Sequence, residues 1–297
     1  MYITNNKQIY SVFNQKTECI NKLEVMLNNS ILKMEKKEII KEIVESSGDI
    51  TGSIGGAVLG TLIAGPAGLV LGGASGVIIT KLFKKIGNEI QERILSSREE
   101  IRIGAAYTFA INKINENLSD GKLIRNDGFF EPEKGRSLSE EILEGIILTA
   151  QKEHEERKVI FLGNLYGNIC TDSSISSDQA NQLIKITNAL TYRQFCLLYL
   201  YNTRKEQNIH STTYNNPSDK RIIPFDIIAE VKDLTQKGLL HTVTSFASLD
   251  GFNCRSFSVT SGGRFYFKVL ELEQIDKKEV EKINQIVNII SSVVTNS

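Results

Sequence analysis

The chain has 297 residues, and its 35 lysines and arginines balance 35 aspartates and glutamates. A neutral chain has no overall field that would attract nucleic acid or an anionic membrane. Four scattered cysteines without a CxxC pair, together with three histidines, argue against a zinc site and a disulfide framework, and they suit a reducing cytoplasm. The length allows two or three modest domains.

The first 48 residues are predicted to form one or two amphipathic helices. The stretch LEVMLNNSILKMEKKEIIKEIVE keeps apolar residues near helical spacing, with lysine and glutamate on the other face. The opening MYITNNKQIY lacks the apolar core of a signal peptide, so a cleaved secretion signal is not expected.

Residues 52–80 contain no charge and place a small residue at every fourth position. Positions i and i+4 share a helix face, so this spacing predicts a smooth groove that another helix can approach closely, as helices do in lipid. Each glycine costs a soluble helix roughly 1 kcal/mol relative to alanine, so the pattern needs a packing reason. The predicted membrane and oligomerisation residues are Gly52, Gly56, Gly60, Ala64, Gly68, Gly72 and Gly76.

Gly65-Pro66 lies near the centre of this run and disfavours one straight helix. As a continuous helix the run would reach about 43 Å, which suits a tilted, kinked span of a hydrocarbon core about 30 Å thick. A hairpin that turns at residues 64–68 is favoured over that span. Burial of the hairpin in a soluble bundle stays open, whereas a phosphate loop is disfavoured because GxxxxGK[ST] is missing.

A long helix is expected after Lys81, with apolar positions that include Ile94 and an end near Leu118, before Asp120-Gly121. Residues 1–130 are therefore expected to form long helices that carry the hairpin of residues 50–80.

Residues 131–188 are expected to form a helical bundle. Ser137 and Glu140 match a capping box, and a second helical pattern covers residues 159–169. Gly163 and Gly167 predict close helix contacts there. A further helix is expected to start at residues 176–178 and to end near residue 189.

Residues 189–275 are predicted to form a winged helix, and residues 276–297 a last amphipathic helix. A capping box at Thr191 and Gln194 opens one helix, and Gly238 ends the next. The strands LLHTVTSF and FNCRSFSV flank a hairpin signal at residues 249–251, and a helix begins at residues 260–263. The predicted fold class is thus mostly α, with a helical bundle, a glycine-rich hairpin and a C-terminal winged-helix (α+β) domain.

The helix DIIAEVKDLTQKG occupies the position of a recognition helix and is expected to expose Asp226, Glu230 and Asp233. DNA-binding proteins usually gain affinity by neutralising phosphates, so this charge pattern favours a protein partner or a structural role over DNA. The predicted partner-binding residues are Lys232, Gln236, Lys237 and Arg255.

Catalytic candidates are few, and neither an enzyme, a cofactor nor a metal is expected. His154 stands in KEHEERK, which indicates a solvated, charged helix face and lacks the second histidine of HExxH. Cys170 and Cys196 are surrounded by apolar residues and are expected to be buried.

Over residues 137–272 the chain resembles bacterial proteins of the abortive-infection alpha (Abi-alpha) type. The matching stretches are EERKVIFLGNLYGNIC, LTYRQFCLLYL, VKDLTQKGLL and VTSGGRFYFKVLEL. The resemblance implies a helical region followed by a winged helix, and a role in prokaryotic defence against phage, as a toxic effector. The glycine-rich run is an addition to that pattern.

The sequence therefore predicts a cytoplasmic protein, with association at the inner membrane, that serves abortive infection. Its glycine-rich hairpin would insert or oligomerise there as a homo-oligomer, while the winged helix binds a protein partner. The alternatives are a winged-helix DNA-binding regulator and a soluble scaffold, in both of which the hairpin is only a packing device.

Overall fold

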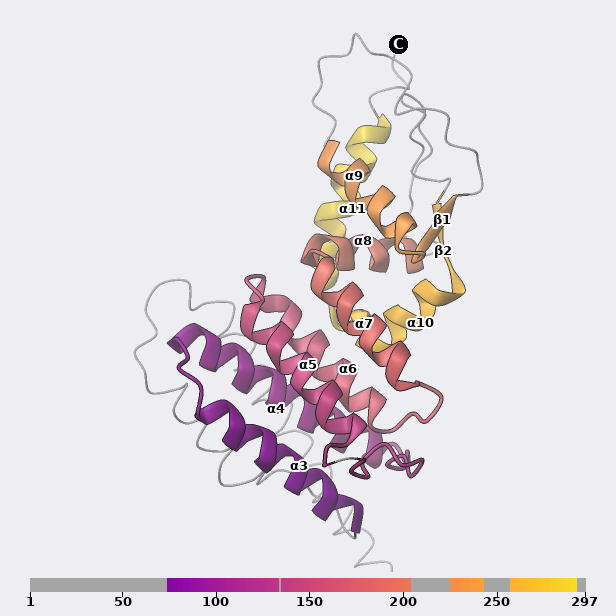
Figure 1. The fold of residues 1–297 in the computed structure, drawn as a ribbon. Coiled ribbons are helices and arrows are strands. Elements are labelled where there is room, and N and C mark those ends of the chain that lie inside the picture. Colours follow the sequence, from indigo (N-terminus) through magenta and orange to yellow (C-terminus); the bar gives the residue numbers. More distant parts are fainter. Residues whose placement is uncertain (1–73, 134, 204–224, 243–256, 293–297) are drawn as a thin grey trace, which may run out of the picture. The chain divides into compact units, whose positions relative to one another are not determined.

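The computed structural model describes residues 74–133, 135–203, 225–242 and 257–292 (Figure 1). Within these ranges the chain is mostly helical, with nine α-helices and one small antiparallel sheet of two strands. Residues 51–297 group into one compact unit, and the expected boundaries at residues 130, 188 and 275 all fall inside it. Residues 1–50 form the other unit and lie outside the described residues.

The first two described helices are α3 (Ala74–Gln91) and α4 (Ser97–Ser119). The prediction of one helix from residue 81 to residue 118 is wrong, because Ser96 begins a new helix by forming a capping box with Glu99. Ile94 was expected on the apolar face, but it lies between the helices and is fully exposed. A local capping signal thus overrides an apolar periodicity that continues across the break.

The predicted bundle consists of α5 (Leu138–Lys152), the short helix η1 (Glu156–Lys158), α6 (Val159–Ile169) and α7 (Ser177–Ala189). The Ser137 hydroxyl caps α5 by accepting a hydrogen bond from Glu140 N. The Glu140 carboxylate does not complete the capping box, because Lys85 Nζ of α3 donates to it at 2.6 Å. A tertiary ion pair therefore replaces the expected local bond.

Helix α6 lies at the centre of this packing, and every one of its residues except Ile160 is buried or nearly so. It packs against α4, α5, α7 and α10 (Ser261–Leu270), which comes from the far end of the sequence. Phe83 of α3 reaches the same core, where its ring lies 5.3 Å from Tyr107 and 5.8 Å from Tyr166.

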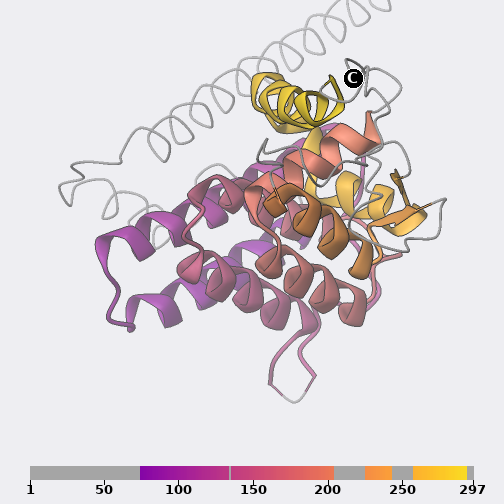
Figure 2. The ribbon, with the colours of Figure 1, turned by 90° about the horizontal axis from the view of Figure 1, so that it is seen from above.

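The C-terminal elements follow in the predicted order. They are α8 (Tyr192–Asn202), α9 (Phe225–Gln236), β1 (Leu240–Thr242), β2 (Phe257–Val259), α10, η4 (Leu272–Gln274) and α11 (Lys277–Ser292). The capping box at Thr191 is confirmed. Gly238 follows the end of α9 and has a φ of 73°, as expected for a glycine at a helix C-terminus. The strands pair antiparallel with Leu240 opposite Val259, and α11 packs on α8 (Figure 2). The predicted turn at residues 249–251 lies outside the described residues.

Candidate functional site

The predicted membrane segment lies almost wholly outside the described residues. Gly52, Gly56, Gly60, Ala64, Gly68 and Gly72 precede residue 74, as does the predicted hairpin turn, and Gly76 belongs to the first turn of α3. Directly after Gly76 in α3, the side chains of Val77 and Ile78 are 54% and 46% exposed.

Helix α3 has two distinct faces. Its inner face consists of buried Ile79, Leu82, Phe83, Ile86 and Ile90. Its outer face begins with exposed Val77 and Ile78 and continues with exposed Lys81, Lys84 and Lys85. Lys85 pairs with Glu140, whereas Lys81 and Lys84 have no ion-pair partner among the described residues.

The acidic side chains of α9 are bound by α8 rather than presented to solvent as a group. Arg193 Nε donates to Glu230 at 2.7 Å, and its guanidinium also pairs with Asp226 at 2.7 Å. Gln194 Nε2 donates to Asp233 at 2.8 Å. The predicted exposure is confirmed for Asp226, but it is wrong for Glu230, which turns toward the start of α8.

Three of the four predicted partner-binding residues lie on α9 or directly after it. Lys232 is half-buried, Gln236 is exposed one turn later, and Lys237 pairs with Asp233 at 2.5 Å. Arg255 lies outside the described residues. With Glu230 counted, α9 and the Lys237 that follows it carry three carboxylates and two lysines, so this helix offers little to a phosphate backbone.

Gly163 and Gly167 of α6 make the close contact that their spacing predicted. A Cβ on Gly163 would overlap Phe109 Cβ and lie 2.8 Å from the carbonyl oxygen of Ala106. A Cβ on Gly167 would lie 2.5 Å from Lys113 Cβ. The two glycines therefore let the backbones of α4 and α6 approach, and the second one makes room for the stem of Lys113.

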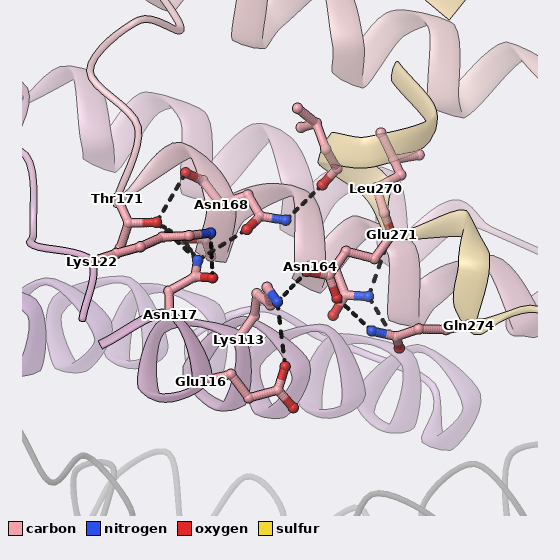
Figure 3. A network of polar contacts seen from close by, with 12 residues as sticks. Lys113, Glu116, Asn117, Lys122, Asn164, Asn168, Thr171, Leu270, Glu271 and Gln274 are labelled. Carbon is pink, nitrogen blue, oxygen red and sulfur yellow. Dashed lines mark hydrogen bonds and ion pairs between the residues drawn. The ribbon is translucent and has the colours of Figure 1, made fainter. Parts of the chain in front are cut away.

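Lys113, whose stem lies beside Gly167, reaches the end of α10 and forms an ion pair with Glu271 (Figure 3). The two side chains are only 8% and 13% exposed, and Glu116 also pairs with Lys113 at 3.4 Å. Glu271 has a φ of 58°, the only positive φ of a residue other than glycine among those described. That conformation costs roughly 1–2 kcal/mol, so the ion pair lies at a strained helix end.

Amide side chains extend this contact along α6. Asn117 Nδ2 donates to Asn168 Oδ1 at 2.9 Å and to Thr171 Oγ1 at 2.8 Å, while Lys122 Nζ donates to Asn117 Oδ1 at 2.8 Å. Asn168 Nδ2 then donates to the carbonyl oxygen of Val269 at 2.9 Å. We call the following set, whose outer members Lys122 and Gln274 are exposed, the buried polar network: Lys113, Glu116, Asn117, Lys122, Asn164, Asn168, Thr171, Glu271 and Gln274 (Figure 3).

The buried polar network fastens the end of α10 to α4 and α6. Buried charges are stable only when they are paired and hydrogen-bonded, so a movement of these helices that separated Lys113 from Glu271 would cost free energy. Asn164 Oδ1 is buried and has no hydrogen-bond partner among the described residues, although the Nδ2 of the same side chain lies 3.5 Å from the Leu270 carbonyl oxygen. Sequence reasoning missed the network, and the asparagines of INKINENL in α4 were its only visible signal.

A second buried ion pair lies just before α6. Lys158 Nζ lies 2.5 Å from Glu153 Oε2, and their side chains are 2% and 4% exposed. Arg102 of α4 donates to the Glu153 carbonyl oxygen at 2.8 Å. The sequence KEHEERK was interpreted as a solvated helix face, and this is wrong for Glu153 and Lys158, although His154 is exposed as expected.

The two described cysteines are buried, as the sequence predicted. Burial raises the pKa of the Cys170 thiol to about 12, and it raises that of the Cys196 thiol to about 12 as well. A thiol reacts as the thiolate, so both side chains are packing groups at neutral pH. Among the described residues, no cluster of histidine, cysteine, aspartate and glutamate has the arrangement of a metal site.

No helix among the described residues is long and apolar enough to cross a bilayer. Comparisons of the chain with protein-family models, with curated proteins and with solved structures find no significant match.

Proposed function

We propose that the chain acts by association, with a bilayer and with copies of itself, through the glycine-rich segment that continues into α3. One observation carries the proposal: the uncharged run of residues 52–80 ends inside α3, where Val77 and Ile78 remain exposed. The other face of α3 is held in the core by Phe83 and its neighbours. The apolar run is thus joined to a helix that is anchored in the core. From there it can reach a bilayer or a second copy of the chain.

Small residues at four-residue spacing allow close helix association, and in lipid such packing is a main source of helix–helix affinity. In this proposal, Gly60 and Gly68 lie at the contact between chains or between the two arms of a hairpin. Oligomers of such segments breach the bilayer, which is the toxic step.

We further propose that residues 189–275 form a winged helix that binds a protein partner. Two observations support it: the order of α8, α9, β1, β2 and α10, and the pairing of the two strands. The net negative charge of α9, and the binding of its acidic groups by Arg193 and Gln194, favour a protein partner over DNA. The buried polar network then couples the end of this unit to α4 and α6.

The resemblance to Abi-alpha proteins supports a place for this activity in bacterial defence against phage. In that role the partner bound by residues 189–275 reports infection and increases the activity of the membrane segment. After infection, cells that express the wild-type chain should survive less often, but should release fewer phage, than cells that express the Gly60→Leu variant. Colony counts measure cell survival, and plaque counts measure phage release.

A leakage assay tests the membrane step directly. The full chain is mixed with vesicles of phosphatidylcholine and phosphatidylglycerol that hold a self-quenched dye. Wild type should release the dye, and Gly60→Leu should not, because leucine fills the groove. Gly55→Leu is the matched control, since it makes the same change off the four-residue register. Equal release by Gly60→Leu and wild type, or no release by any of the three proteins, would overturn the proposal.

A further inference from the structure

We infer that the outer face of α3 is a binding site for anionic phospholipid headgroups, with Lys81 and Lys84 as the residues that contact them. The inference deepens the proposed function and rests on it, because it states which lipid the membrane segment meets. Its evidence is the order of apolar and charged groups along one face of α3.

Exposed residues of α3 change type at one point. Val77 and Ile78 are exposed and apolar, and they belong to the uncharged run that ends at Thr80. Lys81 and Lys84 follow on the same face, since Val77, Lys81 and Lys84 stand four and three residues apart. An apolar patch followed at once by lysines is the arrangement of a helix that enters a bilayer from its surface.

The spacing along the helix fits the thickness of a headgroup layer. At 1.5 Å per residue, Lys81 lies about 6 Å and Lys84 about 10 Å beyond Val77. Each headgroup layer is about 5–8 Å thick. With Val77 at the edge of the hydrocarbon core, the flexible stem of Lys81 ends within that layer and that of Lys84 reaches its outer edge.

Charge favours an anionic surface over a second protein or a neutral lipid. Lys85, the third lysine, is neutralised by Glu140 at 2.6 Å, but no described residue pairs with Lys81 or Lys84. Helix α3 contains three lysines and a single acidic residue, Glu89, near its far end. Two ammonium groups that no described residue neutralises, beside an exposed apolar patch, match phosphate groups above a hydrocarbon surface.

The test is sedimentation of the full chain with vesicles, either of phosphatidylcholine with phosphatidylglycerol or of phosphatidylcholine alone. A basic residue near an anionic surface contributes about fivefold in binding, so Lys81→Gln/Lys84→Gln should bind the anionic vesicles about 25-fold more weakly than wild type. Lys277→Gln/Lys278→Gln of α11 is the matched control, because it removes two exposed lysines and the same net charge. Circular dichroism checks that each variant folds.

Each result decides between the inference and the proposed function. Equal losses in the two double variants, or equal binding of wild type to both vesicle types, would overturn the headgroup site. If Lys81→Gln/Lys84→Gln binds normally while Gly60→Leu abolishes dye release, the headgroup site is wrong and the proposed function stands. If the lysine variant loses binding but Gly60→Leu and Gly55→Leu release dye equally, the headgroup site stands and the glycine stripe has no role in leakage.

Discussion

Helix α6 carries two glycines at four-residue spacing, and α3 begins with Gly76, the last small residue of the run that has the same spacing, yet the two helices differ in what covers these glycines. In α6, α4 lies so close to Gly163 and Gly167 that a Cβ at either position would collide with it. In α3, Gly76 is followed by Val77 and Ile78, which are exposed. The comparison teaches that this spacing indicates close packing but does not identify the partner, which is the chain itself for α6 and an outside surface for α3 in our proposal.

The largest expected difference between the two helices is in thiol reactivity. We compare Cys170, at the end of α6, with a cysteine introduced by Val77→Cys, each as the only cysteine of the chain. Because burial raises the pKa of Cys170 to about 12, against about 8.5 for an exposed thiol, iodoacetamide should label the α3 position more than about a thousandfold faster. In urea the two rates should converge. Comparable rates in the folded protein would show that α6 is not enclosed.

The buried polar network can be broken at its ion pair. Lys113→Ala leaves the carboxylate of Glu271 nearly buried without its cation, and should lower the free energy of unfolding by about 3 kcal/mol. Urea denaturation measures the loss. The double variant Lys113→Met/Glu271→Gln removes both charges and should recover most of it. A double variant as unstable as the single one would mean that packing, and not charge, holds this junction.

A smaller effect is expected where α4 and α6 touch. Gly163→Ala should lower the free energy of unfolding by about 1–3 kcal/mol, because the added methyl group meets Phe109 and the backbone of Ala106. Gly145→Ala of α5 is the control, since its Cβ would meet only Ile184 Cδ1 at 3.4 Å. That change should be neutral or stabilise by up to about 1 kcal/mol through helix propensity. Thermal unfolding in which both variants shift in the same direction would contradict this assignment.

The smallest expected effect is on the pH dependence of stability, and it arises at the start of α4, directly after α3. Hydrogen bonds from Ser96 and from Gln151 lower the pKa of Glu99 from 4.5 to about 2. Because the folded-state pKa lies below the unfolded one, this contribution is present above pH 4.5 and is lost as the pH falls toward about 2. Glu99→Gln should flatten the acid dependence of stability in that window, measured by urea denaturation at several pH values. An acid dependence that is unchanged in Glu99→Gln would contradict this assignment.

Local features of the chain were predictable to within a residue or two. The starts of α7, α8 and α10 follow from side-chain hydroxyls at Ser176, Thr191 and Thr260 that accept a hydrogen bond from a backbone N–H three residues later. The contact of Gly163 and Gly167 with another helix also followed from spacing alone. The same reasoning failed at Ile94, because apolar periodicity does not register a break whose signal is the capping box at Ser96.

The candidate sites were only partly predictable. Lys232, Gln236 and Lys237 could be assigned to one helix from their spacing, but the contact between Glu230 and Arg193 depends on how α9 meets α8. Likewise, nothing within a few residues of Lys113 or Lys158 indicates that their ammonium groups are buried. Such contacts join residues from separate elements, and no local pattern specifies them.

By itself, the sequence determined the helical class, the caps that begin most helices, the uncharged run and the small-residue spacing within it. These features depend on bonds and faces within a few residues of one another. Only the tertiary structure decided that α4 covers the glycines of α6, that Lys113 meets Glu271, and that Val77 and Lys81 remain on an outer face. Burial and pairing depend on which distant segments pack together, and a charge is solvated or enclosed only once that packing exists.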